Sequence, residues 1–275
     1  MEPPVPLWLV AGGRQLVAVL AILSGAASGL AECPAGEEIR ATLAGLQLER
    51  AARTEEFGLE PLDALYEKAL KTPGKPVLER NGKLAQAVLL TTYPIESLWM
   101  AINDEDHYAG GDYLPVRHSE VIEGVPRGER RLLFQYFKRS GVGRWWIDEV
   151  VMSRGLYQES DGMLWELQWW DLMETRGEED LPAEFSDLGL APIRESRGAW
   201  LMIPLGDSCT LVEYVTVSKP GGFLNVAQWF AAGHVIRETL EGIQRLASDH
   251  IPQPHPEARF IRPDGSAIDA SEPQQ

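Results

Sequence analysis

Histidine and cysteine are the residue types used most often in catalysis and metal binding, and this 275-residue chain has only five His and two Cys. No two histidines have the spacing of a helical metal site such as His-Glu-x-x-His. The segment GDSCT at 206–210 contains a serine but lacks the second glycine of a nucleophile elbow. No glycine-rich phosphate loop is present either. The motifs therefore favour binding over catalysis.

A few charged or titratable residues could still act on a ligand. His234 lies in a predicted helix and could serve as an acid or base in a cavity, although a partly exposed or hydrogen-bonded helix residue is the more usual explanation. Arg117, Asp148 and Glu213 fall at predicted strand positions, where a buried charge needs a partner. An arginine–carboxylate pair there could orient the polar end of a ligand, although most such charges face solvent.

The two cysteines are Cys33 and Cys209. A disulfide between them is permitted in an oxidising compartment. Two unpaired thiols, with Cys209 buried in a strand, explain the sequence equally well. The sequence leaves both alternatives open.

Charge and composition exclude several function classes. The chain has 25 Lys plus Arg against 41 Asp plus Glu, a net charge of −16, which argues against a nucleic-acid partner and against lasting attachment to anionic lipid. The hydrophobic fraction of 44% is typical of a globular protein. The unusual number is nine tryptophans, which need a large apolar volume to line or to fill.

Residues 1–31 have the pattern of a secretory signal peptide. Arg14 precedes an apolar stretch over 16–23, small residues follow, and Gly29-Leu30-Ala31 is a cleavage site. The apolar stretch is shorter than the roughly 20 residues of a membrane span. A retained anchor and a lipoprotein signal ending at Cys33 are the alternatives. We expect cleavage after Ala31 and a periplasmic or secreted protein.

The elements that must position these residues are a run of antiparallel strands followed by one long helix. Apolar residues at steps of three and four over 223–248 predict that helix, and short turns between strands predict the antiparallel sheet. We expect an N-terminal helical segment over 32–75, a ligand-binding domain over 76–250 and a disordered polar tail over 251–275. The expected elements are two helices within 37–71, a strand over 84–92, a helix over 94–103, a loop over 104–115, and strands over 116–124, 131–139, 144–154, 163–172, 193–205 and 209–218.

A sheet of this size cannot bury one face under a single straight helix unless it curls around that helix. Such a curled sheet leaves an interior volume, which is a natural ligand site. Alternation along 163–172 places Trp165, Leu167 and Trp169 on one apolar face. Tightly packed core is the alternative explanation for each aromatic residue. The predicted lining is Phe134, Tyr136, Trp146, Trp165, Leu167, Trp169, Tyr214, Phe230, Gly233, His234 and Ile236.

Two segments are similar to a known family. Residues 198–225 contain two strands that lead through Pro220-Gly221-Gly222 into the long helix, and residues 93–121 begin with Tyr93-Pro94. Both resemble START-like lipid-transfer domains of the helix-grip (SRPBCC) superfamily over about residues 60–250. Lys219 departs from the acidic residue usual before Pro-Gly-Gly. The resemblance implies an α+β helix-grip fold, with a curved antiparallel sheet around a long C-terminal helix.

The resemblance also implies an apolar cavity for a lipid, sterol or polycyclic ligand. The leading hypothesis is an exported, non-enzymatic and monomeric carrier of such a ligand, with transient membrane contact and neither cofactor nor metal. Loop 104–115 or the start of the long helix would move to admit the ligand. A polyketide cyclase/aromatase-like or hydrolytic enzyme on the same fold is the alternative, and an adhesion module without a cavity is a third.

Overall fold

The computed structural model describes residues 33–57, 63–110, 113–139, 142–172, 174–177, 180–186, 191–220, 225–249 and 259–268. The predicted signal peptide and its cleavage site lie outside these residues and stay predictions. Within the described ranges, no helix is long and apolar enough to cross a membrane.

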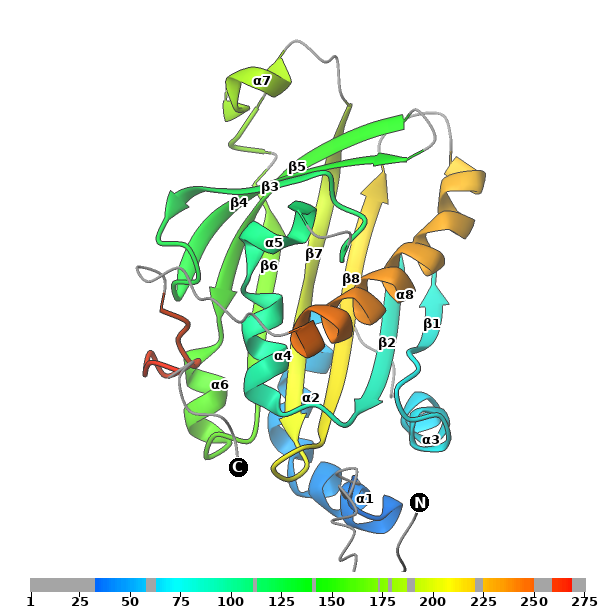
Figure 1. The fold of residues 1–275 in the computed structure, drawn as a ribbon. Helices are drawn as coiled ribbons and strands as arrows, with labels where there is room; N and C mark the ends of the chain where they lie inside the picture. The colour runs from blue at the N-terminus through cyan, green and yellow to red at the C-terminus, as the bar shows by residue number, and fades with distance from the viewer. Residues whose placement is uncertain are drawn as a thin grey trace, which may run out of the picture. The chain divides into compact units, whose positions relative to one another are not determined.

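One antiparallel sheet of eight strands forms the centre of the domain, in the order β1-β2-β8-β7-β6-β5-β4-β3 (Figure 1). Beyond the end of β6, β5 pairs directly with β7, so the sheet bends and β3 to β5 run crosswise to β8. This arrangement confirms the predicted α+β fold, a curved antiparallel sheet with a long C-terminal helix. The strands are β1 (Val77–Asn81), β2 (Leu84–Thr91), β3 (His118–Gly124), β4 (Arg130–Arg139), β5 (Val142–Met152), β6 (Trp165–Asp171), β7 (Ala191–Pro204) and β8 (Thr210–Pro220).

Helices α4 (Ile95–Ile102) and α8 (Asn225–Asp249) lie across one face of the sheet, called here the inner face. The apolar stripe of α8 buries Ile236, Leu240 and Ile243 in one core with α4 and the inner-face side chains of the strands. Apolar residues thus recur every 3.6 residues along α8 because one face of the helix is buried, as predicted.

The opposite, outer face of the sheet is covered as well. Helices α1 (Gly36–Gly45), α2 (Gln47–Phe57) and α3 (Asp63–Lys71) form the N-terminal layer, where Ile39 and Leu65 pack with Val88 and Leu201 of the sheet. A separate outer cluster forms where the short helix α7 (Ala183–Ser186) places Phe185 against β4 and β5.

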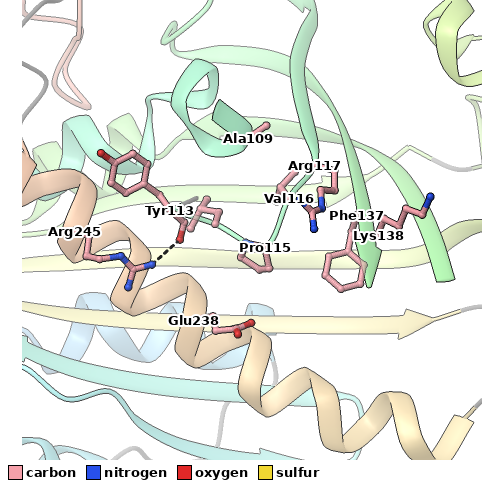
Figure 2. A pocket seen from close by; sticks show the side chains of 10 residues that line it. Ala109, Tyr113, Pro115, Val116, Arg117, Phe137, Lys138, Glu238 and Arg245 are labelled. Carbon is pink, nitrogen blue, oxygen red and sulfur yellow. Dashed lines mark hydrogen bonds between the residues drawn. The ribbon is translucent and has the colours of Figure 1, made fainter. Parts of the chain in front are cut away.

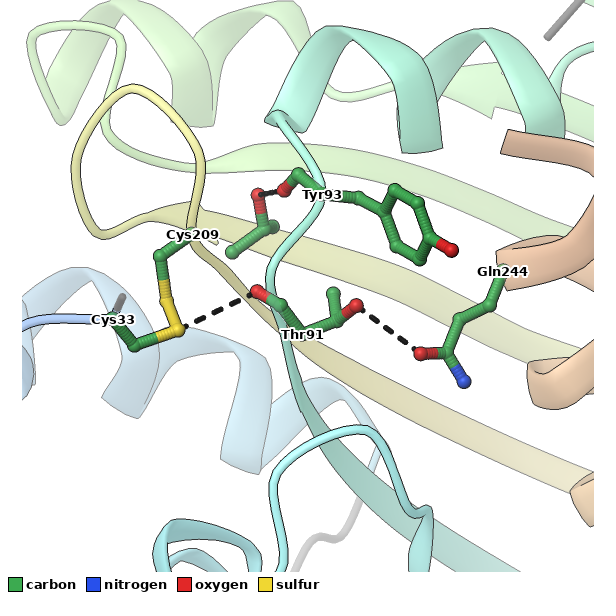
Figure 3. The surroundings of a disulfide bond; sticks show 6 residues. Cys33, Thr91, Tyr93, Cys209 and Gln244 are labelled. Carbon is green, nitrogen blue, oxygen red and sulfur yellow. Dashed lines mark hydrogen bonds between the residues drawn. A yellow bond between two sulfur atoms is a disulfide. The ribbon is translucent and has the colours of Figure 1, made fainter. Parts of the chain in front are cut away.

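A disulfide joins Cys33, just before α1, to Cys209, just before β8, across 176 residues of sequence (Figure 3). The sulfur of Cys33 lies 3.6 Å from the carbonyl oxygen of Thr91 at the end of β2. The Thr91 hydroxyl in turn donates a hydrogen bond to Gln244 of α8 at 3.1 Å. The structure therefore selects the paired alternative and ties the N-terminal layer to the sheet.

Residues 259–268 pack against the domain, so the prediction of a disordered tail is wrong for this segment. Phe260 and Ile268 are buried in the main core. The indole of Trp99 donates a hydrogen bond to the carbonyl oxygen of Ile261 at 2.8 Å, and the Arg127 guanidinium lies 4.9 Å from the Phe260 ring. These few apolar residues in a polar stretch give too short a pattern to recognise from sequence.

The predicted loop 104–115 contains a helix, α5 (Glu105–Gly110). Buried ion pairs to the β3–β4 turn and to β4 hold its first residues: Asp104 with Arg127, and Glu105 with Arg131. A helix this short depends on such tertiary contacts rather than on propensity. Two other short elements were not predicted, β1 and α6 (Arg154–Glu159).

Candidate functional site

The inner face of the sheet carries a group of large aromatic side chains. The rings of Trp169 on β6 and Tyr214 on β8 stack at 5.6 Å between centroids, and Trp200 of β7 lies 4.4 Å from Tyr214. Gly198 of β7 makes this arrangement possible, because a Cβ at that position would collide with the Trp169 ring and with the carbonyl oxygen of Val215. The rings of Trp169 and Tyr214 therefore meet above Gly198, where β7 has no side chain.

The structure places five of the eleven predicted lining residues on this face, and a sixth, Ile236, on the side of α8 that packs against it. Trp165, Leu167, Trp169, Tyr214 and Ile236 belong to the inner core or pack against it. Trp146 is half-buried and lies on the inner face of β5 by alternation with Val150. Their contact with a ligand stays a prediction.

Phe134 and Tyr136 do not lie on the inner face, and this part of the prediction is wrong. Both belong to the outer cluster with Trp145 and Phe185. Leu133, Gln135 and Phe137 occupy the inner-face positions of β4 instead. Each face of β4 thus carries large apolar side chains as well as polar ones, so alternation could separate the faces but not assign them.

Of the predicted lining residues on α8, Gly233 and His234 do not lie in the inner core. The Phe230 side chain lies outside the described part of the structure. Gly233 faces the edge strand β1, with Leu78 at 3.5 Å from its would-be Cβ. The His234 side chain is 57% exposed and forms an ion pair with Glu238 at 2.9 Å, so it does not lie in the inner core. In the described part of the chain, no three His, Cys, Asp or Glu side chains are grouped to hold a metal ion.

A pocket of about 290 Å³ lies between α8, the end of β4 and the segment 113–117 (Figure 2). Its apolar part includes Val116 and Phe137, and Phe137 belongs to the inner face of β4. Glu238 and three cationic residues complete it: Arg117, Lys138 and Arg245. The pocket is called here the rim pocket, because it lies where the inner face reaches the edge of α8. Arg117, a sequence candidate, lines it.

The segment 113–117 rests directly on α8. Arg245 donates a hydrogen bond to the carbonyl oxygen of Tyr113 at 3.3 Å, and Gly242 is buried against Tyr113 and Leu114. No side chain fits at position 242, since a Cβ would collide with the Tyr113 carbonyl. This glycine sets how closely one wall of the rim pocket approaches the helix.

Gly242→Ala is therefore expected to displace segment 113–117 and to increase the rate of trypsin cleavage after Arg117 severalfold. The expected loss of stability is about 1–3 kcal/mol, as for other overpacked sites. The matched control is Gly233→Ala in the same helix, where the added methyl makes ordinary contacts, with Leu78 at 3.5 Å and Arg80 at 3.9 Å. This control should raise stability by up to about 1 kcal/mol through helix propensity. Equal cleavage rates in the two variants would contradict the role of Gly242.

A polar group interrupts the apolar inner face. Asp148 of β5 accepts a hydrogen bond from the Ser196 hydroxyl at 3.1 Å, and Asp171 of β6 accepts one from the Ser196 backbone N–H at 2.9 Å. Burial raises the pKa of Asp148 well above its usual range, and the nearby charge of Asp171 adds to the effect. Burial likewise raises the pKa of the Tyr214 hydroxyl. Sequence reasoning singled out Asp148 but had no signal for Ser196, which shares no local pattern with it.

The raised pKa of Asp148 predicts how stability depends on pH. The folded state holds this proton more tightly than the unfolded state, so its contribution to stability is lost as pH rises from about 4 through the folded-state pKa. Asp148→Asn keeps the shape and removes this ionisation. We expect the variant to gain stability over the wild type as pH rises from 4 to 9 in denaturant titrations. Parallel pH profiles of the two proteins would contradict the assignment.

Glu213, the other acidic strand candidate, faces the outer side and not the ligand face. It lies 3.1 Å from Arg53 of α2, and Arg53 also binds Glu166 of β6. The Tyr66 hydroxyl of α3 donates a hydrogen bond to Glu213. Glu213 thus has an arginine partner, but that partner was not among the sequence candidates, and the pair fixes the N-terminal helices to the sheet instead of lying in a cavity.

The inner face and α8 together form a curved antiparallel sheet with one long helix across it, which is the arrangement of a helix-grip domain. No protein-family profile and no curated protein matches the chain. Similar solved structures include the STAR-related lipid transfer protein (fragment 25–204) from Xanthomonas axonopodis, at a TM-score of 0.45 and 14% identity over 65% of this chain and 99% of that one.

Two further structures belong to the same comparison. Human StAR-related lipid transfer protein 5 aligns at a TM-score of 0.49 and 14% identity, over 74% of this chain and 99% of that one. The Zhui aromatase/cyclase from Streptomyces sp. R1128 aligns at 0.42 and 12% identity, over 60% and 92%. These likenesses are likenesses of structure at low identity, and they extend neither to a ligand nor to an activity.

Proposed function

We propose that this protein is an exported carrier of a small hydrophobic ligand, which binds between the inner face of the sheet and α8. The observation that carries the proposal is the aromatic group formed by Trp169, Tyr214 and Trp200 over the bare strand at Gly198. Flat rings on a concave apolar face suit a flat or chain-like apolar molecule. The rim pocket lies at the edge of this face and supports a path for entry.

Two observations support export. The predicted signal peptide precedes the described domain, and the Cys33–Cys209 disulfide is of a kind that persists in oxidising compartments. The net charge of −16 favours brief visits to a membrane rather than a lasting hold on anionic lipid. The enzyme alternative would place His234 at the ligand, and its exposure on α8 gives that alternative no support.

The test is native mass spectrometry of the protein purified without detergent, together with displacement of the neutral dye Nile red by added lipids. We expect a co-purified lipid-like mass, and dye binding that Trp169→Ala weakens severalfold. Trp170→Ala is the matched control, because this neighbouring indole lies on the outer face and binds Glu149 at 3.0 Å. Absence of any bound molecule and of any dye binding would overturn the proposal.

A further inference from the structure

One buried carboxyl group differs from the others in the described part of the chain. Every other buried acid has an arginine partner, whereas no ion pair is present at Asp148, which is 4% exposed. A buried acid that is not part of a structural ion pair is a candidate for function. The paired acids are Asp104 with Arg127, Glu105 with Arg131, Glu149 with Arg130, and Glu166 and Glu213 with Arg53.

Asp148 lies on the inner face among the aromatic residues. Strand register places it opposite Leu133 of β4 and Asp171 of β6, and Trp146 and Val150 are its same-face neighbours on β5. Leu133 and Val150 belong to the inner core, which fixes the direction of the side chain. The carboxyl therefore faces the side on which the proposed ligand lies.

The two oxygens of this carboxyl have different environments. Oδ2 accepts the Ser196 hydroxyl at 3.1 Å. Oδ1 is buried and has no hydrogen bond of ordinary length and angle within the described residues. The Trp146 indole, on the same face of β5, interacts with the carboxyl and lowers its pKa against the effect of burial. A buried oxygen without a hydrogen bond lowers the stability of the folded protein. A ligand or an ordered water that forms a hydrogen bond with it removes this cost.

The charges around Asp148 limit what that ligand can be. On β6, Asp171 faces the same side, and on β8 the Tyr214 hydroxyl has a raised pKa. On β4, the nearby Arg131 is already paired with Glu105. On β5, Arg144 occupies a same-face position four residues away and has its own interactions. Among the described residues, the site thus offers two acids and no ion pair to either of them, which disfavours an anionic group.

We propose that Asp148 binds the polar end of the ligand, and that this end is an uncharged oxygen, an alcohol or a carbonyl, on an otherwise apolar molecule. The proposal rests on the proposed function and names its ligand class. With Oδ2 accepting from Ser196, the proton of the neutral carboxyl lies on Oδ1 and is donated to the ligand oxygen. Burial favours this neutral form over the ionised carboxylate that an ammonium group would need.

Four probes of similar length test this assignment by displacement of Nile red: 1-decanol, decanoate, decylamine and undecane. In the wild type, 1-decanol should bind more tightly than either charged probe. Asp148→Leu should weaken 1-decanol about tenfold, the size expected for one lost hydrogen bond, and should leave undecane unchanged. Asp148→Asn keeps a donor and should weaken 1-decanol less than about threefold. Asp207→Leu, in the exposed turn between β7 and β8, is the matched control and should change nothing.

Tighter binding of decanoate or decylamine, or 1-decanol binding that Asp148→Leu leaves intact, would overturn this proposal while the carrier function stands. Failure of all four probes to displace the dye would overturn the carrier function, and the ligand class with it. The order of the probes in the wild type decides the question even where the leucine variant does not fold.

Discussion

Replacing Cys33 by Ser together with Cys209 by Ala is expected to lower the free energy of unfolding by about 3–5 kcal/mol. The disulfide closes a loop of 176 residues, and the entropy it removes from the unfolded chain grows with the length of that loop. Alanine suits position 209 because Cys209 is buried among apolar residues of the outer core. The quantity to measure is the denaturant midpoint, converted to free energy with the slope of the transition.

Reduction of the wild-type protein supplies the control for this variant. A strong reductant should shift the wild-type midpoint to nearly that of the double variant and should leave the variant where it is. A wild-type midpoint that does not move under reducing conditions would show that the bond contributes nothing to stability. Since Cys33 precedes α1, loss of the bond should first loosen the N-terminal layer, which hydrogen exchange of residues 36–45 would detect.

Arg53→Met is expected to destabilise the protein by about 3–5 kcal/mol, because it leaves the carboxylates of Glu166 and Glu213 buried without their shared cation. Arg53 and both acids are nearly inaccessible to solvent. Denaturant titration of the variant and the wild type at pH 7 measures the loss.

Arg40→Met is the matched control for Arg53→Met. Arg40 binds Glu67 at 2.7 Å in the same layer of helices, but both side chains are about half exposed. The loss there should stay below about 1 kcal/mol, as for other surface ion pairs. A similar loss for both variants would mean that burial does not set the strength of the Arg53 network. Addition of Glu166→Gln to Arg53→Met should restore stability in part, since one unpaired charge is removed.

The strands and the long helix could be predicted because each has a clear period. In β6, polar Glu166 and Gln168 alternate with Trp165 and Trp169, and the inner face was assigned correctly. In β4 each face carries both large apolar and polar side chains, and the outer set was assigned to the inner face. Alternation thus assigns a face only where the other side of the strand is polar.

Long-range pairing was beyond the reach of sequence patterns. Arg53 and Glu166 are 113 residues apart, and nothing local to either residue indicates the other. The same holds for Ser196 with Asp148 and for the contact of Phe260 with Arg127. Glu213 was recognised as a strand charge that needs a partner, but its partner came from a helix on the outer face and not from the cavity.

The packing of segment 259–268 against Trp99 has a consequence for how the chain acquires its structure. The last contacts of the core join residues about 160 positions apart, and the disulfide joins residues 176 apart. The contact at Ile261 can form only when nearly the whole chain has been made, and the disulfide only after Cys209 has followed Cys33. Folding should therefore be slow, as for other topologies dominated by distant contacts, and Cys33 should wait as a free thiol until Cys209 arrives.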